Sequence, residues 1–476
     1  RESVDPKQLR LFEAGQQLLA KLEQEALEGA PKEQGRKPIK GHGRAPFPER
    51  LPRQTVTLDL PEDERTCADC GGSLHEIGVD VTERGHIIPA RLVVKRYERP
   101  KYACGHGHAV KMAPLPEGVI DKGKYEASAY AYVAVAKYAD HQPLNRIQSI
   151  FKRGGVHFAR QTMWGQLVLL HELVAQPVLK QMRLELLEEP VLQTDETPIR
   201  VQTEGERGTR TGQLWVWRNV RGSPVEKVVA DFRPDRSSKG PADFLGDWSG
   251  ALLTDGYDGV NPVAERNGIA RAGCWAHARR KFVEALDSSL SKAAAVLLPI
   301  QRLFWIERAV VARAERDGRD LDQLRQLRER VRGRRSRRLL ELIFELAFEL
   351  DEDASVSAGS KLAKAVRYLI NQREPLTAML RDGRLPIHNN DTERDLRHVA
   401  VGRKNWQVFG SQRGGEVAAG LYSLIMSCKL AGVAPDEYLE DVLQRISTTP
   451  MDRITELTPW GWKARRAAEA AAVAAA

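Results

Sequence analysis

Three carboxylates in this sequence stand where they could hold metal ions together. Asp195 lies in the first of several short β-type runs, Asp255 lies at the C-terminal end of the fourth run, and Glu393 lies near the start of a helical stretch. Strand ends of α/β sheets are common places for sites. Three carboxylates on such a sheet and an adjacent helix can hold two divalent cations about 4 Å apart, as in-line phosphodiester chemistry requires. Because Mg²⁺ prefers hard oxygen ligands, we expect Mg²⁺ (or Mn²⁺) here.

Each of these carboxylates also has an ordinary structural interpretation. Asp195 could form a turn ahead of Pro198, and Asp255 begins an Asp-Gly turn signal. Glu393 follows Asn390 at the spacing of a capping box, in which two side chains cap each other's backbone N–H groups. Taken singly, the structural interpretations are favoured, and only the combination favours a metal site. If Glu393 binds metal, the reciprocal half of that capping box should be missing.

A second group of residues has the spacing of zinc ligands. Cys67 and Cys70 form a Cys-x-x-Cys turn, and Cys104 follows after a stretch that alternates like a two-stranded hairpin. Zinc takes four tetrahedral nitrogen or sulfur ligands, so we expect His108 as the fourth ligand, with His106 as the alternative. An incidental or redox-active cysteine pair is the competing interpretation. Such a small closed site would stabilise the local fold.

The length of the chain predicts several folded units, and its net charge predicts a polyanionic partner. A chain of 476 residues is too long for one core. Its net charge of +9 suits nucleic acid or an acidic membrane surface. We expect no membrane span, because no apolar run approaches the roughly 20 residues required, and no signal peptide, because the first residues are polar.

The order of helix-like and strand-like segments predicts a multidomain α+β protein. Before residue 188 we expect a helix (1–30) that is either an ordinary amphipathic helix or a short coiled coil, a basic linker (31–62), a zinc-binding domain (63–112) and a helix-turn-helix-like DNA-binding region (113–187). Two merely packed helices would give the same pattern as that last region. From residue 188 we expect a mixed α/β region (188–284), then long helical stretches (285–385), a further segment that contains Glu393 (386–447) and a C-terminal tail (448–476).

Basic and aromatic residues near the carboxylates are candidate DNA contacts. They are His277, Arg279, Arg280, Arg394, Arg397, Arg403, Lys404, Trp406 and Arg413. Alternatives remain for several of them. His277 follows Cys274 as half of a metal site or as a structural histidine beside a packed thiol. Arg397 could form an i,i+4 ion pair with Glu393, and Trp406 could be a core residue.

An arginine run between residues 325 and 338 has two interpretations of its own. Its members are Arg325, Arg328, Arg330, Arg332, Arg334, Arg335, Arg337 and Arg338. A charge run of this kind is usually a solvated helix face. Because acidic partners are scarce here, a surface that faces phosphates is about as well supported.

Three stretches of the sequence resemble the transposases of the insertion sequence 66 family. They are QTDETPIRV, LLTDGYDGV with GCWAHARRKF, and HNNDTERDLRHVAVGRKNWQVFGSQRGGE. The resemblance covers nearly the whole chain and implies a leucine-zipper-like first helix. It also implies an RNase H-like catalytic core in two parts (188–284 and 386–447), interrupted by a helical insertion (285–385), with a DDE triad on Asp195, Asp255 and Glu393. Two positions depart from the family pattern. Gly107 stands where a second Cys-x-x-Cys would end, and His388 stands where the family tends to have Asp.

The resemblance implies a bacterial cytoplasmic DDE transposase that works on nucleoid DNA. Such an enzyme binds the terminal inverted repeats of its element as double-stranded DNA, hydrolyses the 3′ ends with Mg²⁺ and joins the freed 3′-hydroxyls to target DNA. A homodimer or higher oligomer on DNA, together with accessory proteins encoded by the element, would be its partners. The rival functions are a nuclease or resolvase of similar fold without strand transfer, and a DNA-binding regulator with a dead catalytic domain.

Overall fold

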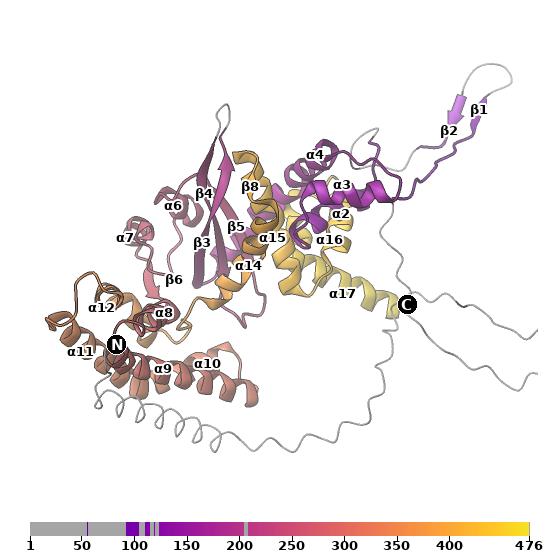
Figure 1. Ribbon diagram of the computed structural model, residues 1–476. Coiled ribbons are helices and arrows are strands. Elements are labelled where there is room, and N and C mark those ends of the chain that lie inside the picture. The colour runs from indigo at the N-terminus through magenta and orange to yellow at the C-terminus, as the bar shows by residue number, and fades with distance from the viewer. Residues whose placement is uncertain are drawn as a thin grey trace, which may run out of the picture. The chain divides into compact units, whose positions relative to one another are not determined.

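The computed structural model describes residue 55 and residues 92–103, 110–114, 119, 123–203 and 208–475 (Figure 1). The chain is divided into two units, residues 1–91 and 92–476, and the second, which is compact, contains nearly all of the described residues. The expected leucine-zipper-like helix and basic linker lie outside the described residues. So do the expected zinc ligands, which are Cys67, Cys70, Cys104, His106 and His108.

A six-stranded mixed sheet organises the second unit, as the run of strand-like segments predicts. The strand order is β5-β4-β3-β6-β7, and β8 pairs with β3. The first three strands are antiparallel, whereas β6, β7 and β8 run parallel to their partners. The strands are β3 (Val191–Gln202), β4 (Thr209–Asn219), β5 (Val228–Arg233), β6 (Ala251–Thr254), β7 (Ala270–Gly273) and β8 (Val408–Phe409).

The central strands follow the residue pattern that burial on one or two faces demands. All four residues of β6 are buried, as expected for a parallel strand covered on both faces. The far half of β3 alternates instead, with Ile199 and Val201 buried and Pro198 and Arg200 exposed. The same strand therefore begins inside the sheet and ends half-exposed.

Helices from both ends of the second unit share one core with the sheet. Four helices precede the sheet, and three follow β8. In α15, the hydroxyl of Ser423 accepts from the Ala230 N–H (2.7 Å) and that of Ser427 donates to the Val228 carbonyl (2.9 Å), so this helix is hydrogen-bonded to β5. The helices are α2 (Ala127–Tyr138), α3 (Leu144–Arg153), α4 (Arg160–Leu170), α5 (Gln176–Leu187), α15 (Gln412–Ala431), α16 (Pro435–Arg445) and α17 (Pro459–Ala475).

No single helix among the described residues is long and apolar enough to cross a membrane. Only α15 and α16 taken together pass that test, and the pair is bent by 119°. Most of α15 is buried in the core that it shares with the sheet.

A second apolar core lies among the helices between β7 and β8. It contains Trp275 and Phe282 of the helix that follows β7, together with Ile300, Ile343 and Leu369 from the next helices. The helices are α8 (Trp275–Ala285), α9 (Leu290–Arg316), α10 (Leu321–Val331), α11 (Arg337–Glu352), α12 (Lys361–Asn371) and α13 (Arg373–Thr377). This region is helical, as the sequence predicts.

A buried ion pair joins α9 to the junction between α10 and α11. Arg332 opens a π-helical turn, Arg332–Ser336, and is fully buried. Its guanidinium donates to both carboxylate oxygens of Glu307 (3.1 and 2.8 Å) and to the carbonyl of Met379 (3.1 Å). Because this arginine is inside the protein, the interpretation of the whole run as a surface is wrong at this position.

Removing the buried guanidinium should strongly destabilise this region. We expect Arg332→Met to lower the free energy of unfolding by about 3–5 kcal/mol, because Glu307 would be left as a buried charge with one partner fewer. Urea unfolding of the purified chain measures the change. The exposed neighbour Arg334→Met is the control, with an expected change within about 0.5 kcal/mol. Equal effects of the two substitutions would contradict the assignment.

Candidate metal centre

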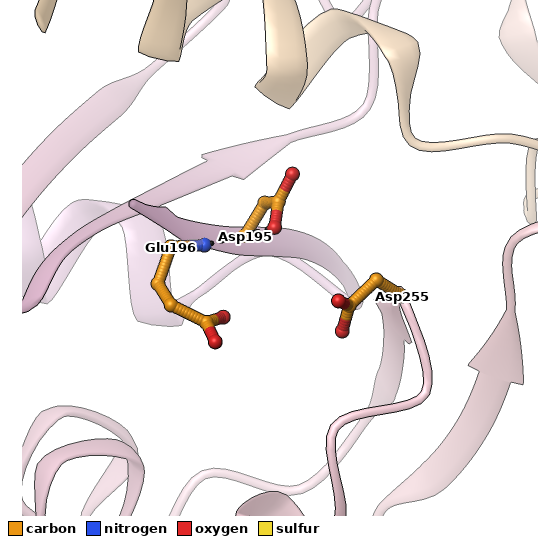
Figure 2. A group of neighbouring side chains, drawn as sticks. All are labelled: Asp195, Glu196 and Asp255. Carbon is orange, nitrogen blue, oxygen red and sulfur yellow. Dashed lines mark hydrogen bonds between the residues drawn. The ribbon is translucent and has the colours of Figure 1, made fainter. Parts of the chain in front are cut away.

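Two of the predicted carboxylates meet where β3 and β6 stop pairing. The parallel ladder joins only Val191–Gln193 to Ala251–Leu253. Asp195 follows two residues later within β3, and Asp255 comes directly after β6. Figure 2 shows Asp255 reaching from its loop toward the β3 residues. The structure therefore brings Asp195 and Asp255 together, as the sequence predicts.

Glu196 is a third member of this cluster that sequence reasoning missed. One ligand oxygen from each of Asp195, Glu196 and Asp255 lies within 4.8 Å of the others. The family resemblance assigns the first triad carboxylate to Asp195 and gives Glu196 no role, and neighbouring residues of a strand normally point to opposite faces. The adjacent Asp-Glu pair in the first strand-like run was the available signal.

The Glu196 carboxylate has one occupied and one unoccupied oxygen. Its side chain is only 5% exposed, and Oε1 accepts from the Arg236 guanidinium (2.7 Å). Oε2 is buried and has no hydrogen-bond partner among the described residues. A buried carboxylate oxygen without a partner is costly unless a cation or donor meets it. The cluster therefore fits a divalent cation.

Burial and mutual repulsion of the carboxylates give the cluster unusual electrostatics. Burial, followed by the nearby charges of Asp255 and Glu196, raises the pKa of Asp195 to about 8. Burial, followed by the charge of Asp255, also raises the pKa of Glu196 above its ordinary value. Anionic oxygens held this close repel one another, so a cation bound among them would stabilise their charged forms.

Asp255 does begin a turn, and the turn leaves the site intact. Its Oδ1 accepts from the Tyr257 N–H (3.0 Å), and Gly256 has a φ of +100° that favours glycine. From α12, the Tyr368 hydroxyl donates to the Asp255 carbonyl (2.8 Å). Gln372 packs where a side chain on Gly256 would lie. The helices of the second core thus support the loop that carries Asp255.

Glu393 lies next to the cluster and is not one of its three members. It occupies the first turn of α14 (Asn390–Trp406). Its two oxygens each lie 3.3 Å from the Arg280 guanidinium, and one lies 3.5 Å from His277 Nε2. Its charge also contributes to the raised pKa of Asp195, although less than those of Asp255 and Glu196. The third predicted carboxylate is therefore at the edge of the candidate site, held by two side chains of α8.

The capping-box prediction at the start of α14 is wrong. The helix does begin at Asn390, but its N-cap residue is Asn389, which makes no side-chain cap bond. Instead, Asn389 Nδ2 donates to the Thr194 carbonyl (2.7 Å), and its Oδ1 accepts from the Thr392 hydroxyl (2.7 Å). The Glu393 carboxylate contacts Arg280, so the reciprocal half is missing. Thr194 lies just beyond the residues of β3 that pair with β6, and its carbonyl is hydrogen-bonded by Asn389 instead.

The two neighbouring asparagines should differ sharply in their effect on stability. Asn389 is fully buried, so Asn389→Ala should lower the free energy of unfolding by about 1–3 kcal/mol, because the Thr194 carbonyl loses its donor. The matched control is Asn390→Ala, since Asn390 is exposed, and a change within about 0.5 kcal/mol is expected. Thermal or urea unfolding measures both variants. A larger loss for Asn390→Ala would contradict the observed helix start.

Cys274 and His277 have separate roles. The Cys274 thiol is buried, accepts from the Asn389 N–H (3.2 Å), and has its pKa raised to about 11 by burial. Burial lowers the pKa of His277, which lies beside Glu393. Within the described ranges, the carboxylate cluster is the only group of three or more potential metal ligands. Cys274 is therefore a packed thiol, and His277 is a neighbour of the site.

Several predicted DNA contacts are already bound to the protein. Arg394 pairs with Asp391 (3.0 Å), and Arg413 pairs with Glu172. Arg403 donates to the Thr197 hydroxyl and the Pro198 carbonyl, both at 2.7 Å. Trp406 is stacked on Phe409 with ring centroids 4.6 Å apart. The contacts of Arg403 and Trp406 tie α14 to β3 and β8. The Arg394 pair lies within α14, whereas the Arg413 pair joins the start of α15 to Glu172.

The remaining predicted contacts face outward or line α8. Arg397 and Lys404 are exposed, and the ion pair with Glu393 that was the alternative for Arg397 is not formed in the described structure. Arg279 lies over the Phe304 ring (5.9 Å). His388, the departure from the family pattern, stacks on the same ring, and its carbonyl accepts from Gln193 (3.3 Å). That histidine therefore has a packing role beside the site.

Comparison with known protein families identifies the class of this chain as DDE transposase. The model described as "Transposase IS66 family" matches residues 122–417. Those described as "zinc-finger binding domain of transposase IS66" and "IS66 C-terminal element" match residues 64–106 and 423–460. The chain belongs to the insertion sequence 66 (IS66) family of transposases, and the resemblance seen in the sequence is confirmed.

Curated relatives of similar length come from Sinorhizobium fredii. The uncharacterized protein y4jD is 33% identical over 441 residues, which cover 89% of this chain and 83% of the relative. The uncharacterized protein y4hP is 31% identical over 447 residues, covering 89% and 78%. The uncharacterized protein y4qI is 32% identical over 468 residues, covering 95% and 83%. The likeness therefore extends through almost the whole chain.

Proposed function

We propose that the chain cuts the 3′ ends of its insertion sequence and joins them to target DNA. The observation that carries this proposal is the cluster of Asp195, Glu196 and Asp255 at the exit of β3 and β6, with Glu393 beside it. A sheet of three antiparallel strands continued by two parallel ones supports an RNase H-like fold for this core. Two DNA ends must be brought together, so we also propose that the protein acts as a homodimer or higher oligomer on bacterial nucleoid DNA.

Different residues of the site would bind the metal ions and the substrate phosphate. Asp195, Asp255 and Glu393 would hold Mg²⁺ or Mn²⁺, and the free oxygen of Glu196 is suited to serve as a further ligand. When bound, such ions activate the attacking water or 3′-hydroxyl and stabilise the leaving oxygen. Arg280, which borders Glu393 and is exposed, can donate to a substrate phosphate.

Neighbouring side chains would keep these ligands in position. The Tyr368 hydroxyl donates to the Asp255 carbonyl and so holds the Asp255 loop. Asn389 donates to the Thr194 carbonyl and so fixes the start of α14, the helix that carries Glu393. Both contacts are made to backbone carbonyls, so they leave the carboxylate oxygens free. They reduce the freedom of the carboxylates before any metal binds.

Neutralising any one of the three predicted triad carboxylates should abolish cutting. We expect Asp195→Asn, Asp255→Asn and Glu393→Gln each to slow cleavage of labelled element ends in Mg²⁺ by about a thousandfold or more, since metal stabilisation of the transition state is worth several kcal/mol. Asp258→Asn is the matched control, because Asp258 is exposed in the same turn region, and it should cut normally. An Asp195→Asn protein that still cuts would refute the triad.

The same assay separates the rival functions. Joined product with a supercoiled target supports strand transfer, whereas cut ends without joined product support a nuclease or resolvase. Specific binding of the ends without any cutting supports a catalytically dead regulator. Repeating the assay with and without the accessory proteins of the element shows whether the chain needs them.

We further propose that zinc is bound by Cys67, Cys70, Cys104 and His108, with His106 as the alternative fourth ligand. The family match to a zinc-finger domain over residues 64–106 supports a zinc site in this segment. The residue types supply the nitrogen and sulfur ligands that zinc prefers.

Zinc content should depend on this group of cysteines alone. Metal analysis of the purified chain is expected to give one zinc per molecule, and Cys67→Ser should lose most of it because a tetrahedral site needs four ligands. Cys428→Ser is the control, since Cys428 is a buried free thiol in α15, and it should keep its zinc. Wild-type protein without zinc, or unchanged zinc in Cys67→Ser, would contradict the proposal.

A further inference from the structure

The arginine run separates into inward and outward groups in the structure. Glu307 binds two members inside the protein, Arg332 at 2.8 Å and Arg328 at 2.7 Å. A third member, Arg325, pairs with Glu329 one helical turn away (3.0 Å). These arginines have protein carboxylates as partners and are part of the local fold.

Four other arginines surround a single buried serine and face outward. Arg334 and Arg335 lie in the π-helical turn, and Arg337 and Arg338 open α11, while Ser336 between the two pairs is buried. All four arginines are exposed. Within the part of the chain that the structure describes, none of them forms an ion pair or a side-chain hydrogen bond. We call these four residues the arginine cluster.

The arginine cluster adjoins two arginines of the inward group that are hydrogen-bonded to residues 379–383, the segment that leads to the candidate site. Arg332 donates to the Met379 carbonyl (3.1 Å), and Arg328 donates to the Gly383 carbonyl (3.5 Å). That segment continues to His388, which stacks on Phe304 of α9, the helix that also carries Glu307. Asn389 and α14 follow at once. The buried ion pair therefore fixes the base of the arginine cluster to the chain that delivers Glu393.

The chemistry of the arginine cluster points to phosphates as its ligand. Like charges within one or two helical turns repel one another, and a polyanion laid across them removes that repulsion. Guanidinium groups match phosphate oxygens with paired N–H donors. The cluster contains arginines only, without the aromatic side chains that stack on unpaired bases, so it fits a continuous backbone better than single-stranded bases.

We infer that the arginine cluster binds the phosphate backbone of duplex DNA without reading its sequence, and holds DNA on the helical region that adjoins the carboxylates. This inference rests on the proposed function, because it takes DNA as the substrate. It adds a contact surface in α10–α11 that is distinct from the metal ligands. An acidic protein surface is the alternative occupant that the experiment distinguishes.

The test uses the full chain and a labelled duplex of random sequence, with no divalent metal added. Fluorescence anisotropy gives the binding constant at several salt concentrations for wild type, R334Q/R335Q and R337Q/R338Q. Each phosphate contact contributes about 0.9 to the slope of log K against log salt. We therefore expect each double variant to bind more weakly and its slope to fall by up to about 1.8.

A control with the same change in net charge removes the nonspecific effect. R445Q/R453Q alters two arginines that already pair with Asp441 (2.9 Å) and Glu456 (2.7 Å), so its slope should match wild type. R334K/R335K keeps the charge and should keep most of the slope, which shows that any loss in the glutamine variant is not a folding defect. Slopes of the cluster variants equal to wild type, or a loss in the control as large as in the cluster, would overturn the inference.

The outcome is independent of catalysis. A wild-type protein that shows this salt dependence but cuts no DNA would contradict only the proposed function. If the protein cuts DNA but its cluster variants bind duplex as wild type does, only the inference that the arginine cluster binds DNA is contradicted. That result would favour an acidic protein as the partner of the arginine cluster.

Discussion

The candidate site depends on how one strand, β3, satisfies its second edge. On one side β3 pairs with β4 along almost its full length, but on the other side β6 supplies partners for three residues only. The segment of α14 and β8 completes that edge. Asn389 donates to the Thr194 carbonyl, Arg403 donates to the Pro198 carbonyl, and β8 pairs with the end of the strand. Asp195 and Glu196 lie in the interval where no strand partner occupies this edge, which leaves space for ligands.

This arrangement also explains why residues from distant parts of the sequence meet. The backbone groups of β3 need hydrogen-bond partners once they are buried, and the start of α14 provides them. The same contact places the first turn of α14, and so Glu393, beside Asp195 and His277. The need of one strand for hydrogen-bond partners thus sets the position of a candidate catalytic helix.

Much of this could be predicted from sequence, and the failures have physical causes. The alternating and apolar runs predicted the mixed sheet, with Asp195 in its first strand and Asp255 at the end of its fourth. Glu196 was missed because neighbours in a strand normally point to opposite faces, and the sequence does not show that the Asp255 loop brings its carboxylate close to both residues. The Asn390 cap was wrong because local spacing cannot show that a distant carbonyl needs Asn389. The arginine run could not be divided into buried and exposed members until its partner, Glu307, was known.

The hydrogen bond from Tyr368 to the Asp255 carbonyl has a consequence for how the site withstands local unfolding. Asp195 belongs to the core of the sheet, whereas the loop of Asp255 rests on a helix of the second core. Regions with separate cores can open with different free energies. Asp195 and Asp255 keep their relative positions only while both cores are folded. The less stable core therefore determines the fraction of molecules in which the site is intact. A substitution deep among the helices can therefore reduce the fraction of competent molecules without touching any residue of the site.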